Sequence, residues 1–412
     1  MYLSYARFLV NGWSSMADQL PKGFRAAGVY TGVKRNPQKL DLSLIVSDSP
    51  CVAAGVFTQN LVFAAPVKLC RERTPSESIR AVVINSGCAN ACTGDQGDRD
   101  AEAMAAKTAS AVGCDATEVL VLSTGVIGEL MPMDKIVPGI DAVASRLASN
   151  EDAIIAAARG MMTTDTRPKI ACRTISIEGR SISLCGIAKG AAMIGPNLAT
   201  MLAVVMTDAK LAVADANEGL KDAADESFNC ISVEGHTSTN DSLILLANGA
   251  AGGPALAGAA LAKFQATLVE ICEDLAQSIP ADGEGATHLI TVEVHGCRSR
   301  DDAIQIDKTV ADSPLVKTAI AGNDPNWGRI VSAAGYAGIP FDASKVCLHL
   351  NGSLLYERGQ PVRFDGAAVS AAMAADRNTG IVLLFEEGES SARFWTSDLT
   401  TEYVRLNADY RT

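Results

Sequence analysis

The sequence contains few of the side chains from which metal sites are most often built. Its 412 residues include only four histidines, and they are dispersed: His236, His288, His295 and His349. Cys88 and Cys92 form the only closely spaced cysteine pair, and no second ligand pair follows them. Because a structural zinc site needs four such ligands, we expect no metal site in this protein.

An excess of positive charge and long apolar runs are also lacking. The 35 Lys and Arg against 47 Asp and Glu give a formal net charge of -12. A nucleic-acid surface needs clustered Lys and Arg to displace counterions, so we expect no nucleic-acid partner. No segment reaches the roughly 20 apolar residues of a membrane-spanning helix, and we expect no membrane association. Small metabolites and protein partners are the expected binding classes.

The cysteine content and the first fifteen residues bear on the cellular compartment of the protein. Eleven cysteines, an odd number spread from Cys51 to Cys347, occur in a chain too large to need disulfides for stability. They predict reduced thiols and a cytoplasmic protein. Residues 1–15 carry Arg7, aromatics and serines but no acid, which fits either a weak transit peptide or a disordered extension. We favour a disordered extension or a misassigned start, because Met16-Ala-Asp-Gln-Leu resembles a natural start.

Short β-like runs alternate with Ala-rich runs, which is typical of an α/β fold. Apolar, β-branched runs predict strands at 42–46, 52–57, 81–85 and 119–123. Ala-, Leu- and Glu-rich runs predict helices at 100–112, 151–162, 214–227 and 256–279. Alternation after Lys169 predicts a hairpin with its turn at 178–180, and the same alternation recurs at 289–294. The expected fold class is α/β (α+β), a layered sandwich of mixed β-sheets with outer helices.

Several loops contain more hydrogen-bonding side chains than turns require. They are 85–94, 123–128, 163–166, 235–241, 282–287 and 322–329. Thr, Asn and Asp also cap helices and close turns, so any one of these loops has a structural explanation. Ser123-Thr124-Gly125 is the most informative, because Gly lets a backbone N–H approach a ligand and the Thr hydroxyl supplies a second donor.

A loop punctuated by Gly and Pro, residues 189–199, leads to Thr200 at the head of the apolar run 201–206. Taken alone, Thr200 is predicted to cap that element. Cleavage of the bond between Ala199 and Thr200 would instead give the hydroxyl an adjacent α-amine as its general base. A free α-amine has a pKa of about 7.7 to 8.0, so modest lowering by burial or by Lys189 leaves it able to accept the hydroxyl proton.

Together these segments resemble the ornithine acetyltransferase family of arginine biosynthesis, also called bifunctional glutamate N-acetyltransferases. The resemblance runs from about residue 20 to the C-terminus and is carried by ordered motifs at 85–94, 123–125, 162–166, 189–209, 237–241, 284–287, 322–329 and 403–412. It implies self-cleavage between Ala199 and Thr200, an alpha chain of residues 16–199 and a beta chain of residues 200–412. It also implies a fold similar in logic to the N-terminal-nucleophile hydrolases but differently connected, and an association of two alpha and two beta chains.

The resemblance implies ping-pong transfer of an acetyl group from N2-acetylornithine to glutamate through an ester on Thr200. The oxyanion hole would be the Thr124 hydroxyl and the Gly125 N–H. Substrate-binding residues carried over from the family motifs are Thr163, Lys189, Thr200, Glu284, Asn407 and Thr412. We expect no cofactor, and the sequence leaves open whether acetyl-CoA is a second acetyl donor.

Chemistry gives two of these residues distinct roles. Lys189 is expected to meet the α-carboxylate that both substrates share, and Glu284 to meet an ammonium group. Outside the motifs, each would be a solvated surface charge. Spacing does not decide which of Thr163, Thr164 and Thr166 faces the ligand.

Three residues leave further questions open. His236 stands where the family pattern suggests an acid, and His288 where it suggests a lysine. Both bear on the electrostatics around the site more than on the reaction. Trp327 either lines the site or is a buried structural residue.

Two other functions remain compatible with the sequence. An aminopeptidase or amidase would keep the threonine and use water or a peptide amine as acceptor. An inactive homologue would keep the precursor uncut.

Overall fold

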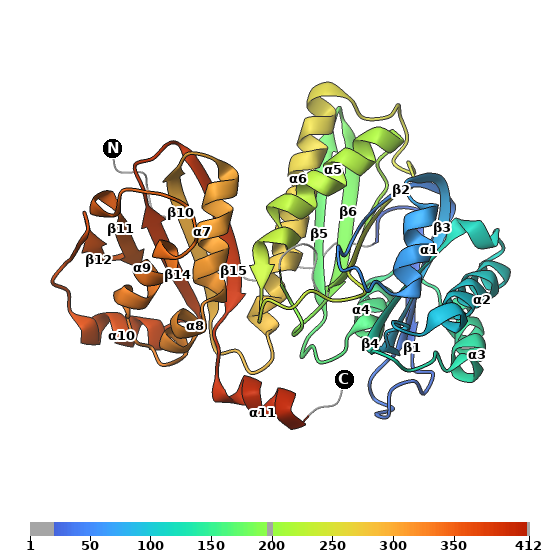
Figure 1. The fold of residues 1–412 in the computed structure, drawn as a ribbon. Helices are drawn as coiled ribbons and strands as arrows, with labels where there is room; N and C mark the ends of the chain where they lie inside the picture. Colours follow the sequence, from blue (N-terminus) through green and yellow to red (C-terminus); the bar gives the residue numbers. More distant parts are fainter. Residues whose placement is uncertain (1–19, 196–200, 410–412) are drawn as a thin grey trace.

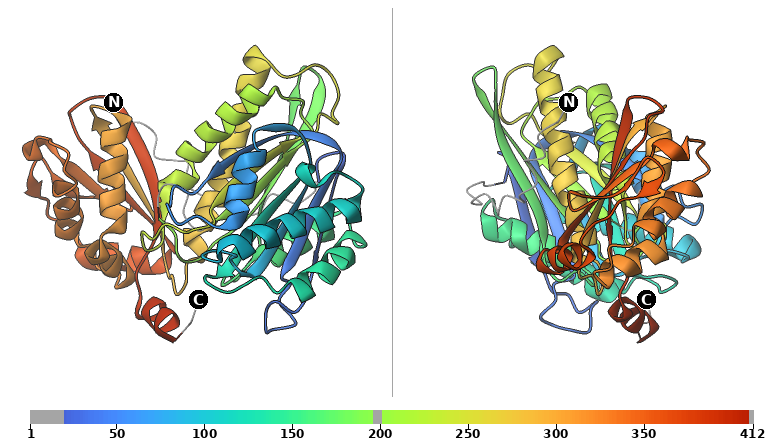
Figure 2. Two further views of the ribbon diagram at one scale, coloured as in Figure 1. Left: turned by 45° about the vertical axis from the view of Figure 1, so that its right-hand side comes forward. Right: turned by 90° about the vertical axis from the view of Figure 1, so that its left-hand side faces the viewer.

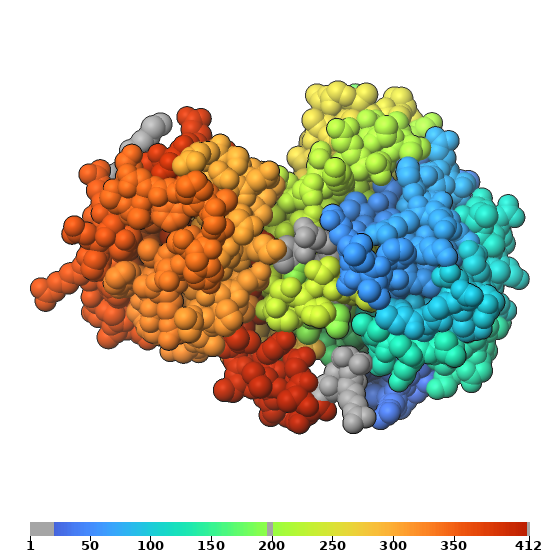
Figure 3. Space-filling view, in the orientation of Figure 1, coloured from blue at the N-terminus to red at the C-terminus, as the bar shows by residue number. Residues whose placement is uncertain are grey.

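The computed structural model describes residues 20–195 and 201–409. It confirms a mixed α/β fold, with two mixed sheets and helices packed against them. The sheets lie in separate lobes that meet at one end and diverge at the other (Figures 1 and 2). The space-filling view shows the surface hollowed where the lobes diverge (Figure 3). The predicted extension 1–15 and the residues Ala199, Thr200 and Thr412 lie outside the described residues.

The first lobe is built on a sheet in the order β4-β3-β2-β9-β7-β6-β5, with β1 beside β2. Its strands are β1 (Phe24–Val29), β2 (Leu42–Phe57), β3 (Ser76–Cys88), β4 (Val119–Val126), β5 (Lys169–Ile177), β6 (Arg180–Lys189), β7 (Leu202–Thr207) and β9 (Ser242–Ala247). The two strands predicted at 42–46 and 52–57 are one strand, β2. Its register with β3 shifts on either side of Cys51, and the polar residues between the two apolar runs lie at this irregularity.

Six helices belong to the first lobe: α1 (Ala65–Arg73), α2 (Gly94–Val112), α3 (Met133–Ala144), α4 (Glu151–Met161), α5 (Val213–Glu226) and α6 (Gly258–Ser278). All four predicted helices are confirmed, although α2 begins six residues early. Its first turns carry Gly94 and Gly97 among polar residues, which hid the helical pattern.

Four short 3-10 turns occur in the described parts of the two lobes and their connections. They are η1 (Ala116–Glu118), η2 (Phe228–Cys230), η3 (Pro280–Asp282) and η4 (Ala343–Lys345).

The second lobe has the strand order β13-β12-β11-β14-β10-β15-β8. Its strands are β8 (Ile231–Ser232), β10 (Leu289–Cys297), β11 (Cys347–Leu350), β12 (Ser353–Glu357), β13 (Gln360–Pro361), β14 (Asn378–Leu384) and β15 (Ser390–Ser397). Its helices are α7 (Arg300–Asp312), α8 (Pro314–Ala321), α9 (Trp327–Gly335) and α10 (Gly366–Ala375), followed by α11 (Thr401–Asp409). The alternating run at 289–294 belongs to β10, which pairs with the distant strands β14 and β15 and with no local hairpin partner.

The predicted hairpin after Lys169 is confirmed as β5 and β6, with Glu178 and Gly179 at positive φ in the turn. The expectation of reduced thiols throughout is wrong for one pair. The register of this hairpin sets Cys172 directly opposite Cys185, and a disulfide joins them. Nine other cysteines are free.

The predicted cut lies inside the first lobe. Residues 190–201 connect β6 to β7, which are adjacent antiparallel strands of one sheet. The predicted alpha and beta chains would therefore share a sheet, and their boundary does not coincide with the boundary between the lobes.

Residues 20–195 and 201–409 offer neither a membrane-spanning helix nor a metal-binding cluster. No helix there combines the length and apolar content required to cross a membrane. No group of three or more His, Cys, Asp or Glu in the same ranges is arranged to hold a metal ion.

Packing of α4 on β1 gives a stability prediction. A Cβ at Gly28 would lie 2.0 Å from the Ala156 carbonyl oxygen of α4. We expect Gly28→Ala to lower the free energy of unfolding by about 1–3 kcal/mol, because the helix must shift outward. Chemical denaturation measures this change. Gly335 is the control, because a Cβ there meets no described atom within 4 Å. Native stability in the Gly28 variant would contradict the packing.

Candidate active site

The ends of β4 and β6 bring two predicted site residues into contact. Lys189 Nζ donates a hydrogen bond to Thr124 Oγ1 at 3.2 Å. Both residues are buried, with 2% and 5% exposure. Four strands separate β4 from β6 in the sheet order, so this contact requires the sheet to curve until its distant strands meet.

Gly125 lies next to this contact in a conformation that favours glycine. Its φ is +135°, and a Cβ there would lie 2.3 Å from the Gly87 carbonyl carbon and 2.6 Å from the Cys88 nitrogen. Gly87 and Gly125 are partners in the parallel pairing of β3 and β4. Close approach of two backbones therefore explains the glycine, and its predicted role in an oxyanion hole stays a prediction.

Charged groups around Lys189 set its electrostatics. Burial lowers the pKa of Lys189, and the Asp165 carboxylate opposes this effect. Asp165 is buried too, which alone would raise its pKa, but Lys169 and Lys189 hold the pKa well below its usual range. An ionised Asp165 therefore favours the charged form of the lysine that is expected to bind substrate.

A buried network fixes the loops behind Lys189. Lys169 Nζ donates to Asp165 Oδ1 at 2.6 Å and to Asp282 Oδ2 at 2.7 Å. Asp165 Oδ1 also accepts from the Gly190 N–H at 2.7 Å. The sequence did not single out Lys169, Asp165 or Asp282 as site residues, although the two aspartates lie in two of the polar loops. Their burial was the missing signal, because sequence does not show which loop charges face each other.

The three threonines of the 163–166 loop differ in their contacts. Asp282 accepts hydrogen bonds from both the N–H and the hydroxyl of Thr166. The Thr163 N–H donates to Asp165 Oδ2 at 2.9 Å. Within the described ranges, the hydroxyls of Thr163 and Thr164 have no such partner. This difference favours Thr163 or Thr164 over Thr166 as a substrate contact.

Two anchors hold the chain on either side of the predicted cut. Before it, the Ile194 N–H donates to Glu234 Oε1 at 2.7 Å, and the Ile194 carbonyl accepts from the Val233 and Gly235 N–H groups at 2.9 and 3.0 Å. After it, the Met201 N–H donates to Asp241 Oδ1 at 2.9 Å. Both anchors come from one segment, residues 233–241.

Of the two acids in this segment, Asp241 is fully buried and Glu234 is partly buried. Burial raises the pKa of Asp241 well above its ordinary value and that of Glu234 to about 8. Glu234 Oε2 and Asp241 Oδ2 are buried without hydrogen-bond partners among the described residues. Asp241 belongs to the 237–241 motif, whereas nothing in the sequence marked Glu234.

Asparagines in the polar loops hold the end of β4 in place. Asn240 Nδ2 donates to the carbonyls of Ala89 and Ser123 at 2.7 and 2.8 Å. Ser123 Oγ donates to Asn85 Oδ1 at 2.5 Å. These loop residues therefore have a structural role, because they position Thr124 and Gly125 near the end of β4.

Glu284 and Asn407 meet across the lobe junction. Asn407 Nδ2 donates to Glu284 Oε2 at 2.9 Å, and the Glu284 N–H donates to the Ala191 carbonyl at 2.9 Å. Ala191 follows Lys189 by two residues. Helix α11 extends from the second lobe beneath the junction (Figure 1), and Gly285 lets it approach, since a Cβ there would lie 2.6 Å from the Tyr403 nitrogen.

The open questions about two histidines and Trp327 have structural answers. His236 is exposed. His288 is buried, and its Nδ1 lies 3.2 Å from Asp398 Oδ2. Trp327 stacks on Tyr356 with ring centroids 5.4 Å apart and packs on a hydrophobic core, so it is structural.

The buried lysine at Asp165 gives a second prediction. Lys169→Met leaves two buried carboxylates without their shared partner, so we expect the free energy of unfolding to fall by about 3–5 kcal/mol. Chemical denaturation measures it. Lys107→Met is the control, because Lys107 pairs with Asp141 at the surface and is expected to contribute less than about 1 kcal/mol. Equal losses in both variants would contradict the buried network.

Comparison with known proteins gives a consistent family match. The model of the ArgJ family matches residues 25–412. The arginine biosynthesis bifunctional protein ArgJ of Rhodopirellula baltica is 46% identical over 396 residues, covering 95% of this chain and 96% of its own. The protein of that name from Symbiobacterium thermophilum is 45% identical over 403 residues, covering 97% and 100%. The crystal structure of arginine biosynthesis bifunctional protein argJ from Bacillus halodurans aligns with a TM-score of 0.49 and 36% identity, covering 50% of this chain and 98% of that chain.

Proposed function

Because the chain belongs to the ArgJ family, we propose that it is an acetyltransferase of arginine biosynthesis that moves the acetyl group of N2-acetylornithine to glutamate. The observation that carries this proposal is the buried contact between Lys189 and Thr124. Pairing of β6 with β7 sets Lys189 opposite Leu202, two residues after Thr200. This register supports a nucleophile beside the lysine and the predicted oxyanion hole.

Self-cleavage would supply the catalytic amine. The Thr200 hydroxyl attacks the Ala199 carbonyl and the peptide nitrogen leaves as the free α-amine, so that an ester joins the two residues. Water then hydrolyses the ester and releases the Ala199 carboxylate. The anchors at Ile194 and Met201 support this step, because they fix the backbone on both sides of the bond.

Acetyl transfer would then use the same hydroxyl. The α-amine of Thr200 accepts the hydroxyl proton while the oxygen attacks the acetyl carbonyl of N2-acetylornithine. The oxyanion accepts hydrogen bonds from the Thr124 hydroxyl and the Gly125 N–H. Lys189 Nζ donates to the Thr124 oxygen, which leaves the hydroxyl proton free for the oxyanion. Ornithine leaves with a proton, and the glutamate amine then takes the acetyl group from the ester.

The charges around the site suit two substrates that share an α-carboxylate. Lys189 is buried beside an ionised Asp165 and would bind the carboxylate, with the Thr163 hydroxyl nearby. Glu284 would bind an ammonium group, with Asn407 holding the Glu284 carboxylate in position. Thr412 is proposed as a further contact. Acetyl-CoA is our proposal for a second acetyl donor, with which the word bifunctional in the relatives' names is compatible.

We further propose that the processed chains associate as two alpha and two beta chains and act in the cytoplasm. The shared first sheet supports the association of one alpha with one beta chain, because β7 and β9 would otherwise lose their neighbours β6 and β2.

Mass spectrometry tests the self-cleavage. We expect the native protein to give two chains divided at Thr200, and Thr200→Ala to give one uncut chain of 42.9 kDa. Thr174→Ala is the control, because Thr174 is an exposed residue of β5. Normal processing of the Thr200 variant would refute the mechanism.

Removal of one oxyanion donor should affect turnover. We expect Thr124→Val to lower kcat by about 10²–10³-fold with a much smaller change in KM, because the hydroxyl acts on the transition state. Steady-state transfer of acetyl from N2-acetylornithine to glutamate measures both. Thr174→Val should match the native enzyme. An unchanged kcat in the Thr124 variant would contradict its role.

Product analysis separates the proposal from the hydrolytic alternative. Incubation with N2-acetylornithine and glutamate should yield ornithine and N-acetylglutamate in equal amounts. Ornithine with free acetate and no N-acetylglutamate would indicate an amidase.

A further inference from the structure

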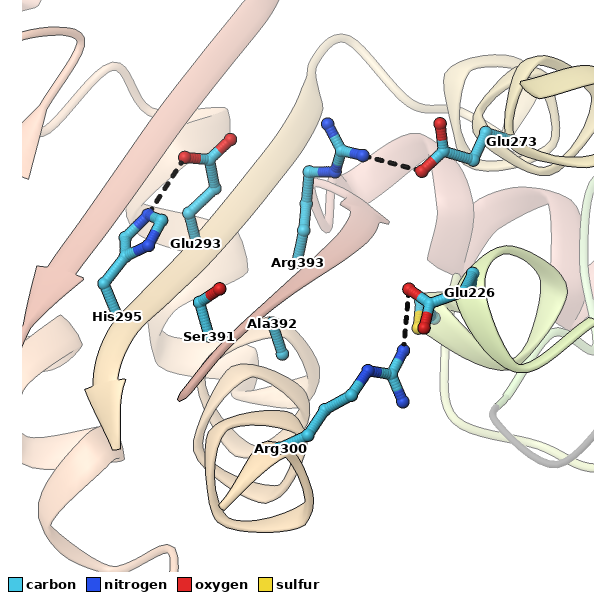
Figure 4. A pocket seen from close by; sticks show the side chains of 9 residues that line it. Glu226, Glu273, Glu293, His295, Arg300, Ser391, Ala392 and Arg393 are labelled. Atoms are coloured by element: carbon cyan, nitrogen blue, oxygen red, sulfur yellow. Dashed lines mark hydrogen bonds and ion pairs between the residues drawn. The ribbon is translucent and has the colours of Figure 1, made fainter. Parts of the chain in front are cut away.

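A pocket lies between the lobes, away from the candidate active site. Its volume is about 260 Å³, and residues of both lobes line it (Figure 4). None of its lining residues belongs to the groups around Lys189. Six of them carry ionisable groups that matter here: Glu226, Glu273, Glu293, His295, Arg300 and Arg393.

Charges of both signs meet in this pocket, with the acids in excess. Arg393 Nη2 lies 2.6 Å from Glu273 Oε1, and Arg300 Nη2 lies 3.0 Å from Glu226 Oε2. Both ion pairs cross from the second lobe to the first. Glu293 has only His295 beside it, at 3.4 Å, so its carboxylate is the one without a cationic side chain as partner among the described residues.

The neighbours of Glu293 leave its charge without a cationic partner. Glu293 on β10 and Arg393 on β15 are direct partners in the antiparallel register, yet Arg393 reaches away to Glu273. Behind the wall, Asp307 of α7 is fully buried, and neither of its carboxylate oxygens has a partner in the described ranges. Burial, and after it the charge of Glu293, raises the pKa of Asp307 well above its ordinary value, so Asp307 gives Glu293 no cationic partner. Glu293 is therefore the lining carboxylate whose charge no described cationic side chain balances.

Arg393 has one buried hydrogen-bond donor without a partner in the described ranges. Its Nε is buried and has no hydrogen-bond partner among the described residues. The guanidinium lies over the Trp395 ring, 4.8 Å from the centroid, which helps to fix its position. A buried donor without a partner costs free energy that a bound acceptor would remove.

We infer that this pocket binds a free α-amino acid with a cationic side chain. The carboxylate accepts hydrogen bonds from the guanidinium groups of Arg393 and Arg300, and a cationic group of the ligand lies against Glu293. The single positive net charge of such a ligand matches the single excess carboxylate of the pocket. Its volume suits a molecule of this size, since it falls below the roughly 300 Å³ at which pockets for drug-sized ligands begin.

Binding here would bear on acetyl transfer, a consequence that rests on the proposed function. Glu273 lies on α6 and Glu293 on β10, and Glu284 lies in the connection between these two elements. A ligand that bridges the two lobes would shift the position of the α6–β10 connection, and with it the position of Glu284. The pocket would then be a regulatory site for an amino acid, separate from the site of the reaction.

Calorimetric titration of the processed protein with L-lysine tests the inference. We expect saturable binding of L-lysine. Cadaverine lacks the carboxylate and L-norleucine lacks the side-chain cation, so each should bind at least about tenfold more weakly. Absence of L-lysine binding, or equal binding of all three compounds, would overturn the inference.

Variants assign the binding to this pocket. Glu293→Gln should weaken L-lysine binding by about tenfold or more, while Glu178→Gln, an exposed control in the β5–β6 turn, should leave it unchanged. Lys189→Met should retain binding. Loss in Lys189→Met, or full binding in Glu293→Gln, would place the ligand elsewhere and overturn the inference.

Two further measurements keep the result interpretable. Without L-lysine, Glu293→Gln should transfer acetyl at the native rate, so a failure of the pocket is distinct from a failure of the proposed function. If Glu293→Gln does not fold, Arg300→Gln provides the same test from the carboxylate side, because Arg300 begins α7 and is partly exposed. Native affinity in the Arg300 variant would then overturn the inference.

Discussion

Curvature of the first sheet is the constraint on which the candidate site depends. Lys189 and Thr124 lie on strands separated by four others, and only the bending of the sheet brings the lysine to the hydroxyl. Next to this contact, the backbones of Gly87 and Gly125 approach too closely for a side chain at Gly125. The contact is buried, so each charge near it must be balanced. Asp165, held by Lys169, supplies the balance for Lys189.

The loops around this contact divide two tasks between them. Residues 233–241 hold the chain on both sides of the predicted cut, through Glu234 and Asp241. The turn at Glu284 joins the candidate site to the second lobe, where Asn407 meets it. The site is therefore assembled from both predicted chains and from both lobes, which explains why its residues are so widely spaced in the sequence.

The sequence predicted the local structure well, because local structure depends on neighbouring residues. The hairpin turn at Gly179 and the helix at 151–162 followed from patterns within a few residues. The motifs also selected Lys189 and Thr124. Their contact, and the buried charge of Lys169, depend on pairings between distant segments that periodicity does not encode. The Cys172–Cys185 bond depends on the hairpin register in the same way, and the general argument from chain size missed it.

The central claim is that Thr200 carries the acetyl group between donor and acceptor. The most direct test is to incubate the processed protein with N2-acetylornithine alone and to map acetylation by peptide mass spectrometry. The account predicts one acetyl group on the peptide that begins with Thr200, and its loss to N-acetylglutamate when glutamate is added. An acetyl group on another residue, or transfer to glutamate with Thr200 never modified, would contradict the account.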